Sequence, residues 1–203
     1  MAGPMSRAAE SGSKMSAQSR SAPSRAPRSL SSAEVREAAD LLGWGPHVAP
    51  RMTLFGVEVH PVVAIDARAH ELRRRSHQPP VLDHDVLAMW QWPEAAPMRA
   101  PEVVTLRGVL CSARSWRSGL SRVSRLRGFC STAVVVTAPL EREEECLLEC
   151  KLLGVGVLER GPSGLRLVEP ARDGRSPQAR RRTLDAWVEE LIYRELLRAG
   201  ILV

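Results

Sequence analysis

The stretch Ser131 to Pro170, STAVVVTAPLEREEECLLECKLLGVGVLERGPSGLRLVEP, decides the predicted fold of this chain. Near its start, an uninterrupted apolar run extends from Ala133 to Val136. The run is too short and too rich in β-branched residues for a helix, and turn-forming residues flank it. We therefore predict a strand that is covered on both faces, as in a parallel or mixed α/β sheet.

The residues after this strand predict a helix followed by a hairpin. Glutamates at positions 141 and 143–145 lie where the positive end of a helix dipole favours negative charge. Gly154 is a natural helix stop, and the turn at 161–164 joins two short strands. One side of the helix carries residues at helical spacing, namely Cys146, Leu147, Cys150 and Leu153. The stretch therefore encodes a strand, a helix and a hairpin.

Length and composition predict one folded domain with an extra segment at each end. The chain has 203 residues and 44% hydrophobic content, which is enough for a buried core. Residues 1–29 are rich in Ser, Ala, Arg, Pro and Gly, so we expect a disordered basic tail that cannot offset its ordering entropy by burial. The α/β domain is predicted over residues 30–170. Residues 171–203 are expected to form a loop and an amphipathic helix that packs on the domain.

The net charge of +6 comes almost wholly from arginine, because Lys14 and Lys151 are the only lysines. Such an excess indicates either a polyanionic partner such as nucleic acid or the composition bias of a GC-rich genome. The sequence has no run of about 18 apolar residues and no apolar signal segment at its N-terminus. It therefore predicts no membrane partner and a cytoplasmic location.

Helix and strand signals also precede the central stretch. A helix is expected from Ser32 to Leu42, because Ser31 and Glu34 have the spacing of a capping box. Pro61 indicates that its strand lies at a sheet edge or contains a bulge, because proline cannot donate a ladder hydrogen bond. The remaining predicted elements are extended segments at 47–54 and 57–66, a strand at 102–110 and a final helix that begins at Ser176 and ends before Gly200.

Val81 to Trp92 is predicted as a strand with two acidic residues at its start, and a short helix is the alternative. On a strand, Asp83 and Asp85 would share one face and His84 the other. The three side chains could hold a metal, but we favour a surface turn.

The segment from Ala113 to Phe129 predicts an amphipathic helix. Its apolar face carries Trp116, Leu120, Val123 and Leu126. Its opposite face carries Arg114, Arg117, Arg122 and Arg125. Guanidinium groups match phosphate oxygens in geometry and charge, so these four arginines are the candidate nucleic-acid-binding residues. The alternative is a solvated outer helix face.

The order of predicted elements over about residues 32 to 170 resembles that of the restriction-endonuclease-like, or PD-(D/E)XK, nucleases. The local matches are the VVVT strand, the helix that runs into LLGVGVL and the hairpin that ends in LVEP. The resemblance implies a central mixed sheet flanked by helices. It also implies an acidic residue at the start of one strand and Glu-x-Lys on the next, where a divalent metal assists phosphodiester cleavage.

This sequence departs from that catalytic pattern. Asp85 matches the first acidic position and is the candidate catalytic residue if the protein is active. Thr105 and Arg107 stand where glutamate and lysine are expected. Threonine cannot replace a carboxylate as an anionic metal ligand, and arginine is effectively never a base. We therefore predict a degenerate nuclease-like fold with no resident cofactor, and Mg²⁺ only if activity survives.

The cysteines at positions 111, 130, 146 and 150 match no familiar metal-binding spacing. Leu147 and Leu153 lie beside Cys146 and Cys150, so we predict that the cysteines are reduced and buried as small hydrophobic residues. An iron–sulfur cluster, which the resemblance makes conceivable, would need all four thiols to converge.

Three functions stay open on the sequence alone. The first is nucleic-acid binding by a degenerate nuclease-like fold, through the arginine face of the helix at 113–129. The second is an active metal-dependent nuclease with a non-standard acidic site drawn from Asp66, Asp85 and Glu102. The third is a protein-interaction or assembly module with no role in nucleic-acid binding.

Overall fold

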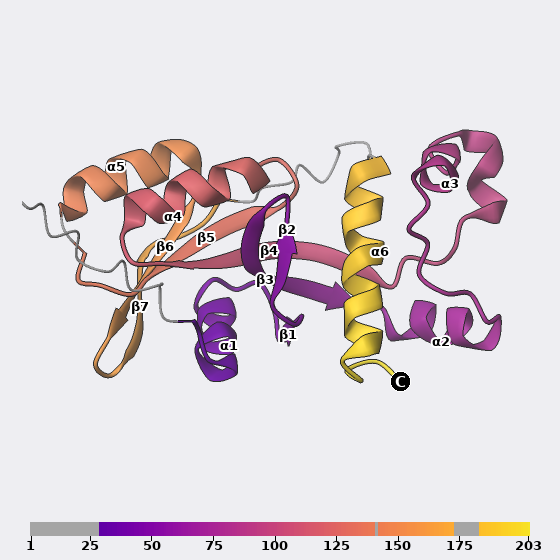
Figure 1. The fold of residues 1–203 in the computed structure, drawn as a ribbon, viewed down its shortest axis with the longest axis horizontal. Coiled ribbons are helices and arrows are strands. Elements are labelled where there is room, and N and C mark those ends of the chain that lie inside the picture. Colours follow the sequence, from indigo (N-terminus) through magenta and orange to yellow (C-terminus); the bar gives the residue numbers. More distant parts are fainter. Residues whose placement is uncertain (1–28, 141, 173–182) are drawn as a thin grey trace, which may run out of the picture.

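The computed structural model describes residues 29–140, 142–172 and 183–203 (Figure 1). Within these ranges the chain is an α/β structure with a curled mixed sheet and helices on both of its faces. All but the last residue of the tail predicted over 1–29 lies outside the described residues. Glu141 and the predicted helix start at Ser176 lie outside them as well.

One seven-stranded sheet, in the order β1-β3-β4-β5-β6-β7 with β2 also paired to β3, is formed by the described residues. The central strands β4, β5 and β6 are parallel, whereas β3 is antiparallel to β4 and β7 is antiparallel to β6. The strands are β1 (His47–Val48), β2 (Met52–Leu54), β3 (Val57–Ile65), β4 (Val104–Ala113), β5 (Ser131–Val136), β6 (Gly156–Gly161) and β7 (Gly164–Glu169).

The helices cover the sheet from two sides. Helices α4 and α5 connect successive parallel strands, and crossovers of this kind share one hand, so both helices lie on the same face (Figure 1). Helix α1 lies on the opposite face, and α6 crosses the sheet between this part of the fold and α2 and α3. The helices are α1 (Ser32–Leu41), α2 (Ala67–Arg75), α3 (His84–Met89), α4 (Trp116–Val123), α5 (Glu143–Leu153) and α6 (Thr183–Arg198), with 3₁₀ turns η1 (Pro93–Met98) and η2 (Ser124–Leu126).

Strand β5 confirms the prediction of a strand covered on both faces, because all of its residues are buried. Val134 and Val136 point into the larger core under α4, α5 and α6. Ala133 and Val135 point into the smaller core under α1. The alternation of side chains along a strand thus divides one apolar run between two cores.

Local sequence signals at helix ends are also confirmed. The Ser31 hydroxyl accepts a hydrogen bond from the backbone N–H of Glu34, and the Glu34 carboxylate accepts one from the backbone N–H of Ser31. Helix α5 ends at Gly154, whose φ of +70° is a conformation that glycine adopts without the steric cost of a Cβ atom. The strand–helix–hairpin unit of residues 131–170 is present as predicted.

The strand predicted over Val81 to Trp92 is wrong, and its short-helix alternative is confirmed by α3. The Asp83 carboxylate accepts hydrogen bonds from the backbone N–H groups of Asp85, at 2.8 Å, and Val86, at 3.2 Å. This arrangement is a helix N-cap, in which a short acidic side chain satisfies the first free N–H groups. Asp83 therefore lies at the start of a helix and not at the start of a strand.

Pro61 lies in the interior of the sheet, so its predicted edge position is wrong. Strand β3 pairs with β1 and β2 as well as with β4. The predicted bulge is confirmed, because the β3–β4 register shifts between Val62 and Val63. The disturbed ladder next to Pro61 accommodates its missing N–H donor.

Helix α6 brings buried acidic residues to the larger core. Glu190 pairs with the fully buried Arg73 of α2, and the Glu189 carboxylate accepts a hydrogen bond from the backbone N–H of Leu106 at 3.1 Å. These contacts join the end of the described chain to α2 and to the start of β4. Besides covering an apolar surface, α6 therefore supplies the carboxylates that bind α2 and β4.

Candidate functional site

The arginine-bearing segment predicted as a helix over 113–129 is helical and amphipathic only over α4 and η2, because Ala113 ends β4 and residues 127–129 are not helical. Helix α4 is followed directly by η2, and together they bury one side against β4 and β5 through Trp116, Gly119, Leu120, Val123 and Leu126. Ser115 caps the helix by accepting a hydrogen bond from the backbone N–H of Ser118. The guanidinium groups of Arg114, Arg117, Arg122 and Arg125 belong to exposed residues, and we call this set the arginine surface.

Arg117 is the member of the arginine surface whose charge is already balanced. It forms an ion pair with Glu145 of α5 and lies over the Trp116 ring, with its guanidinium carbon 4.6 Å from the ring centroid. The hydrogen bond from Arg117 lowers the pKa of the Glu145 carboxyl, and Arg142 contributes in the same direction. An incoming anion would therefore compete with Glu145 for Arg117.

The other three arginines have no carboxylate partner among the residues that the structure describes. Arg122 lies close to the Cys111 thiol: burial raises the pKa of that thiol and the guanidinium opposes the rise. Arg114 and Arg125 lie at the two ends of the segment, just outside α4. Three exposed arginines without a carboxylate partner in the described residues thus lie along or beside a segment whose other side is buried.

The acidic residues considered for metal binding lie at helix starts and on the surface. Asp85 is exposed in the first turn of α3, and the Asp66 carboxylate caps α2 by accepting a hydrogen bond from the backbone N–H of Ala69 at 2.9 Å. Glu102 is exposed just before β4. His84 stacks on Trp187, with the ring centroids 5.2 Å apart. Across the described ranges, no group of three or more His, Cys, Asp and Glu side chains is arranged to hold a metal ion.

The buried acids of α6 are the site-like residues that sequence reasoning missed. Asp185, Glu189 and Glu190 are at most 8% exposed, although acidic side chains are rarely buried. Asp185 and Glu189 stand one helical turn apart, next to the apolar positions Val188 and Ile192. That spacing is the signal that could have placed them on the buried side.

The cysteines are buried and unlinked, as predicted. All four belong to the larger core, and the Cys146 and Cys150 sulfurs lie 3.9 Å apart on successive turns of α5. Burial raises the pKa of the Cys150 thiol to about 12, and the neighbouring Cys146 adds to the rise. A thiol with such a pKa stays protonated and is a poor nucleophile at neutral pH.

This environment predicts that the native protein reacts slowly with a thiol reagent such as Ellman's reagent at pH 8. The reagent attacks thiolates, and a pKa raised above the working pH keeps the thiol neutral while burial blocks access. The absorbance change should be small in native buffer and should reach four thiols per chain in denaturant. A rapid native reaction, assigned by single Cys→Ser variants, would contradict a core role for that cysteine.

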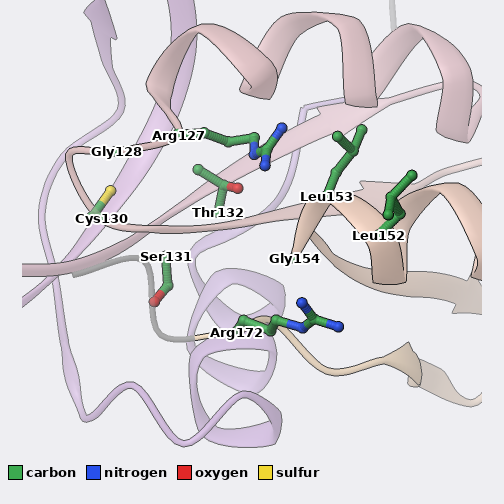
Figure 2. Close-up of a pocket in the computed structure, with 9 residues that line it drawn as sticks. All are labelled: Arg127, Gly128, Cys130, Ser131, Thr132, Leu152, Leu153, Gly154 and Arg172. Carbon is green, nitrogen blue, oxygen red and sulfur yellow. The ribbon is translucent and has the colours of Figure 1, made fainter. Parts of the chain in front are cut away.

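A small pocket lies where the turn after η2, the start of β5 and the end of α5 meet (Figure 2). Its volume is about 260 Å³, and its lining includes Arg127, Thr132, Leu152, Gly154 and Arg172. The two arginines are far apart in the sequence, so no local pattern marks them as a pair. Figure 2 shows both of their side chains extending toward the end of α5.

Comparison of the chain with protein-family models, with curated proteins and with solved structures gave no match. The resemblance to the restriction-endonuclease-like nucleases therefore stays a prediction. Among the helices of the described residues, none combines the length and the apolar character needed to cross a membrane.

Proposed function

We propose that the protein binds nucleic acid through the arginine surface, on a nuclease-like fold that has lost its catalytic residues. The observation that carries the proposal is the row of exposed guanidinium groups at Arg114, Arg122 and Arg125, which have no carboxylate partner within the described residues. An ordinary solvated helix face of a globular protein usually carries both signs of charge, whereas α4 and η2 carry no acidic residue.

The dimensions of the segment suit a phosphate backbone. At about 1.5 Å per helical residue, the eight residues of α4 span roughly 12 Å, and Arg114 and Arg125 lie just beyond its two ends. A nucleic-acid strand carries one phosphate per roughly 3.4 Å along a duplex axis, so several phosphates could meet the three arginines. Contacts of this kind fix the position of the backbone but do not read bases, so the expected binding has weak sequence preference.

Two features of β4 support the proposal that the fold has no catalytic activity. Thr105 and Arg107 are at the positions where the resembled family carries its acid and its lysine. The neighbouring N–H group of Leu106 is occupied by the Glu189 carboxylate. The first half of β4 is therefore used to attach α6.

The test is to replace all four residues of the arginine surface with glutamine and to measure binding by fluorescence anisotropy. The wild-type protein should bind labelled single strands and duplexes, with an affinity that falls steeply between about 50 and 200 mM salt. Three phosphate contacts predict a slope of about −2 to −3 in a plot of log affinity against log salt concentration. The quadruple variant should lose most of the affinity and most of the slope.

A matched control separates this surface from net charge. Replacing Arg51, Arg74, Arg75 and Arg166 with glutamine removes four exposed arginines that already have carboxylate partners. Both quadruple variants lower the formal net charge from +6 to +2. Equal binding by the two variants would contradict the proposed site, and absence of binding by the wild type would favour an interaction module instead.

The same binding mixtures report on catalysis when Mg²⁺ or Mn²⁺ is added. We expect the labelled strands and a supercoiled plasmid to stay intact. If the wild type cleaves the nucleic acid and Asp85→Ala does not, the protein is a metal-dependent nuclease and the hypothesis of lost catalysis is wrong.

A further inference from the structure

The residues that line the pocket shown in Figure 2 include two exposed arginines, Arg127 and Arg172, and no acidic residue. Neither Arg127 nor Arg172 has a hydrogen bond from its side chain or an ion pair with any residue in the described part of the chain. Two cations that share a pocket repel each other unless an anion lies between or beside them. No negatively charged side chain among the pocket-lining residues therefore offsets the two positive charges.

Arg172 is held in place by its backbone and by the carbon atoms of its side chain. Its backbone N–H donates a hydrogen bond to the Gly154 carbonyl at 3.2 Å. A Cβ atom on Gly154 would lie 3.3 Å from the Arg172 Cβ and 3.4 Å from its Cδ, so the glycine leaves room for the arginine stem. The charged end is therefore positioned by packing and stays available for a ligand.

Thr132 lines the pocket and supplies a hydroxyl group. The residue is 2% exposed, and its hydroxyl makes no hydrogen bond within the described residues. Figure 2 shows the hydroxyl oxygen on the Arg127 side of β5, directed along the pocket lining. A ligand oxygen in this pocket could accept a hydrogen bond from this hydroxyl.

The charge balance at the pocket favours an anion even though a helix ends there. The C-terminal end of α5 contributes about half a negative elementary charge. The two arginines contribute two full positive charges, and their guanidinium groups cannot lose a proton at physiological pH. The cationic side chains therefore dominate the local field.

We propose that this pocket binds a phosphate group, with Arg127 and Arg172 as its charge partners and Thr132 as a hydrogen-bond donor. Arginine forks match phosphate oxygens, and a hydroxyl can donate to the remaining oxygen. A volume of about 260 Å³ is below the roughly 300 Å³ at which pockets for drug-sized ligands begin, so the ligand is a phosphate with a small substituent or the terminal phosphate of a longer molecule. The site uses none of the residues of the arginine surface and does not depend on that proposal.

The experiment titrates the full-length protein with inorganic phosphate at constant ionic strength and follows its thermal midpoint, with sulfate as the comparison anion. A dissociation constant of about 1 mM predicts a rise of roughly 5 °C or more at a hundredfold excess of phosphate over that constant. Both anions also stabilise proteins without binding, and that general effect is the same in a variant. The readout is therefore the difference between wild type and the variants Thr132→Val and Arg172→Gln.

Thr132→Val changes a hydroxyl to a methyl group and should weaken phosphate binding about tenfold, while Arg172→Gln should weaken it more. The paired variant Arg74→Gln/Arg75→Gln, at exposed arginines that pair with Glu71 outside both proposed sites, should respond to phosphate like the wild type. Equal responses of the wild type and the two pocket variants, or no response of the wild type beyond that to sulfate, would overturn the proposal.

A second arm identifies the source of the phosphate. Short oligonucleotides with and without a 5′-phosphate are compared for wild type and Thr132→Val. Tighter binding of the phosphorylated strand that Thr132→Val removes assigns the pocket to strand ends. A response to inorganic phosphate with no effect of the 5′-phosphate assigns it to a small phosphate ester. Either outcome supports the phosphate site and leaves the arginine surface to its own test.

Discussion

Glu190→Ala is expected to lower the free energy of unfolding by about 3–5 kcal/mol, because it leaves a buried arginine without its counterion. Arg73 is 0% exposed, and its two terminal nitrogens lie 2.7 and 3.0 Å from the two Glu190 oxygens. The same carboxylate accepts a hydrogen bond from the backbone N–H of Val81 at 2.8 Å. Removal of this carboxylate therefore leaves both the Arg73 charge and the Val81 N–H group without a partner.

The remaining contacts of Arg73 explain why the charge cannot move to water. Its guanidinium donates hydrogen bonds to the carbonyl groups of Gln78, Pro79 and Pro101, and it lies over the Tyr193 ring. The side chain therefore holds the loop after α2 and the segment before β4 against α6. Loss of Glu190 should loosen all of these segments at once.

Urea denaturation of wild type, Glu190→Ala, Arg73→Met/Glu190→Leu and Arg74→Ala measures the effect. The double variant removes both charges and should recover most of the loss, since apolar replacement of a buried pair is often neutral or stabilising. Arg74→Ala removes a neighbouring exposed ion pair with Glu71 and should change stability little. If Glu190→Ala unfolds at the same urea concentration as Arg74→Ala, the pair is not a structural clamp.

Gly119→Val is expected to cost about 3 kcal/mol or more, because α4 packs on the sheet at this glycine without space for a side chain. A Cβ atom at Gly119 would meet the Val134 Cγ1 at 2.2 Å and the Ala113 Cβ at 3.1 Å. These neighbours are stiff, buried groups on β5 and β4 that cannot swing away. The helix would have to move outward.

Gly119→Ala separates this packing effect from helix propensity. Alanine favours a helix by about 1 kcal/mol over glycine, whereas overpacking costs about 1–3 kcal/mol, so the net change should still be destabilising. Ser121→Ala, at an exposed position of the same helix, is the control and should have little effect. Val134→Ala should rescue Gly119→Ala in a double-mutant cycle, with a coupling of about 0.5–3 kcal/mol. Stabilisation by Gly119→Ala alone would contradict the close approach.

Local signals explain how much of this fold the sequence could predict. The apolar run of β5, the Ser31–Glu34 box and the stop at Gly154 each act within a few residues, so they are readable without a structure. The segment at 81–92 was misread because an Asp before an apolar run opens a strand or caps a helix equally well. The choice between the two depends on tertiary contacts of α3 with α6.

The candidate sites also differ in how far the sequence alone predicts them. The arginine surface is predicted from helical spacing alone, and all four of its residues are exposed in the structure. The pocket of Arg127 and Arg172 and the Arg73–Glu190 pair join residues from distant parts of the chain, and Asp185 and Glu189 are buried although they are acidic. The sequence shows that a residue is charged but does not show whether its side chain contacts water or another side chain.

The position of Glu190 also sets the order in which this chain can fold during synthesis. Arg73 leaves the ribosome 117 residues before its counterion, and the start of β4 appears 83 residues before Glu189. Strands β3, β4 and β5 can pair in that interval, but Arg73 of α2 does not meet its charge partner until α6 emerges. Contacts of such long sequence separation form slowly. The nascent chain therefore carries Arg73 without its counterion beside an incomplete core until α6 packs against α2.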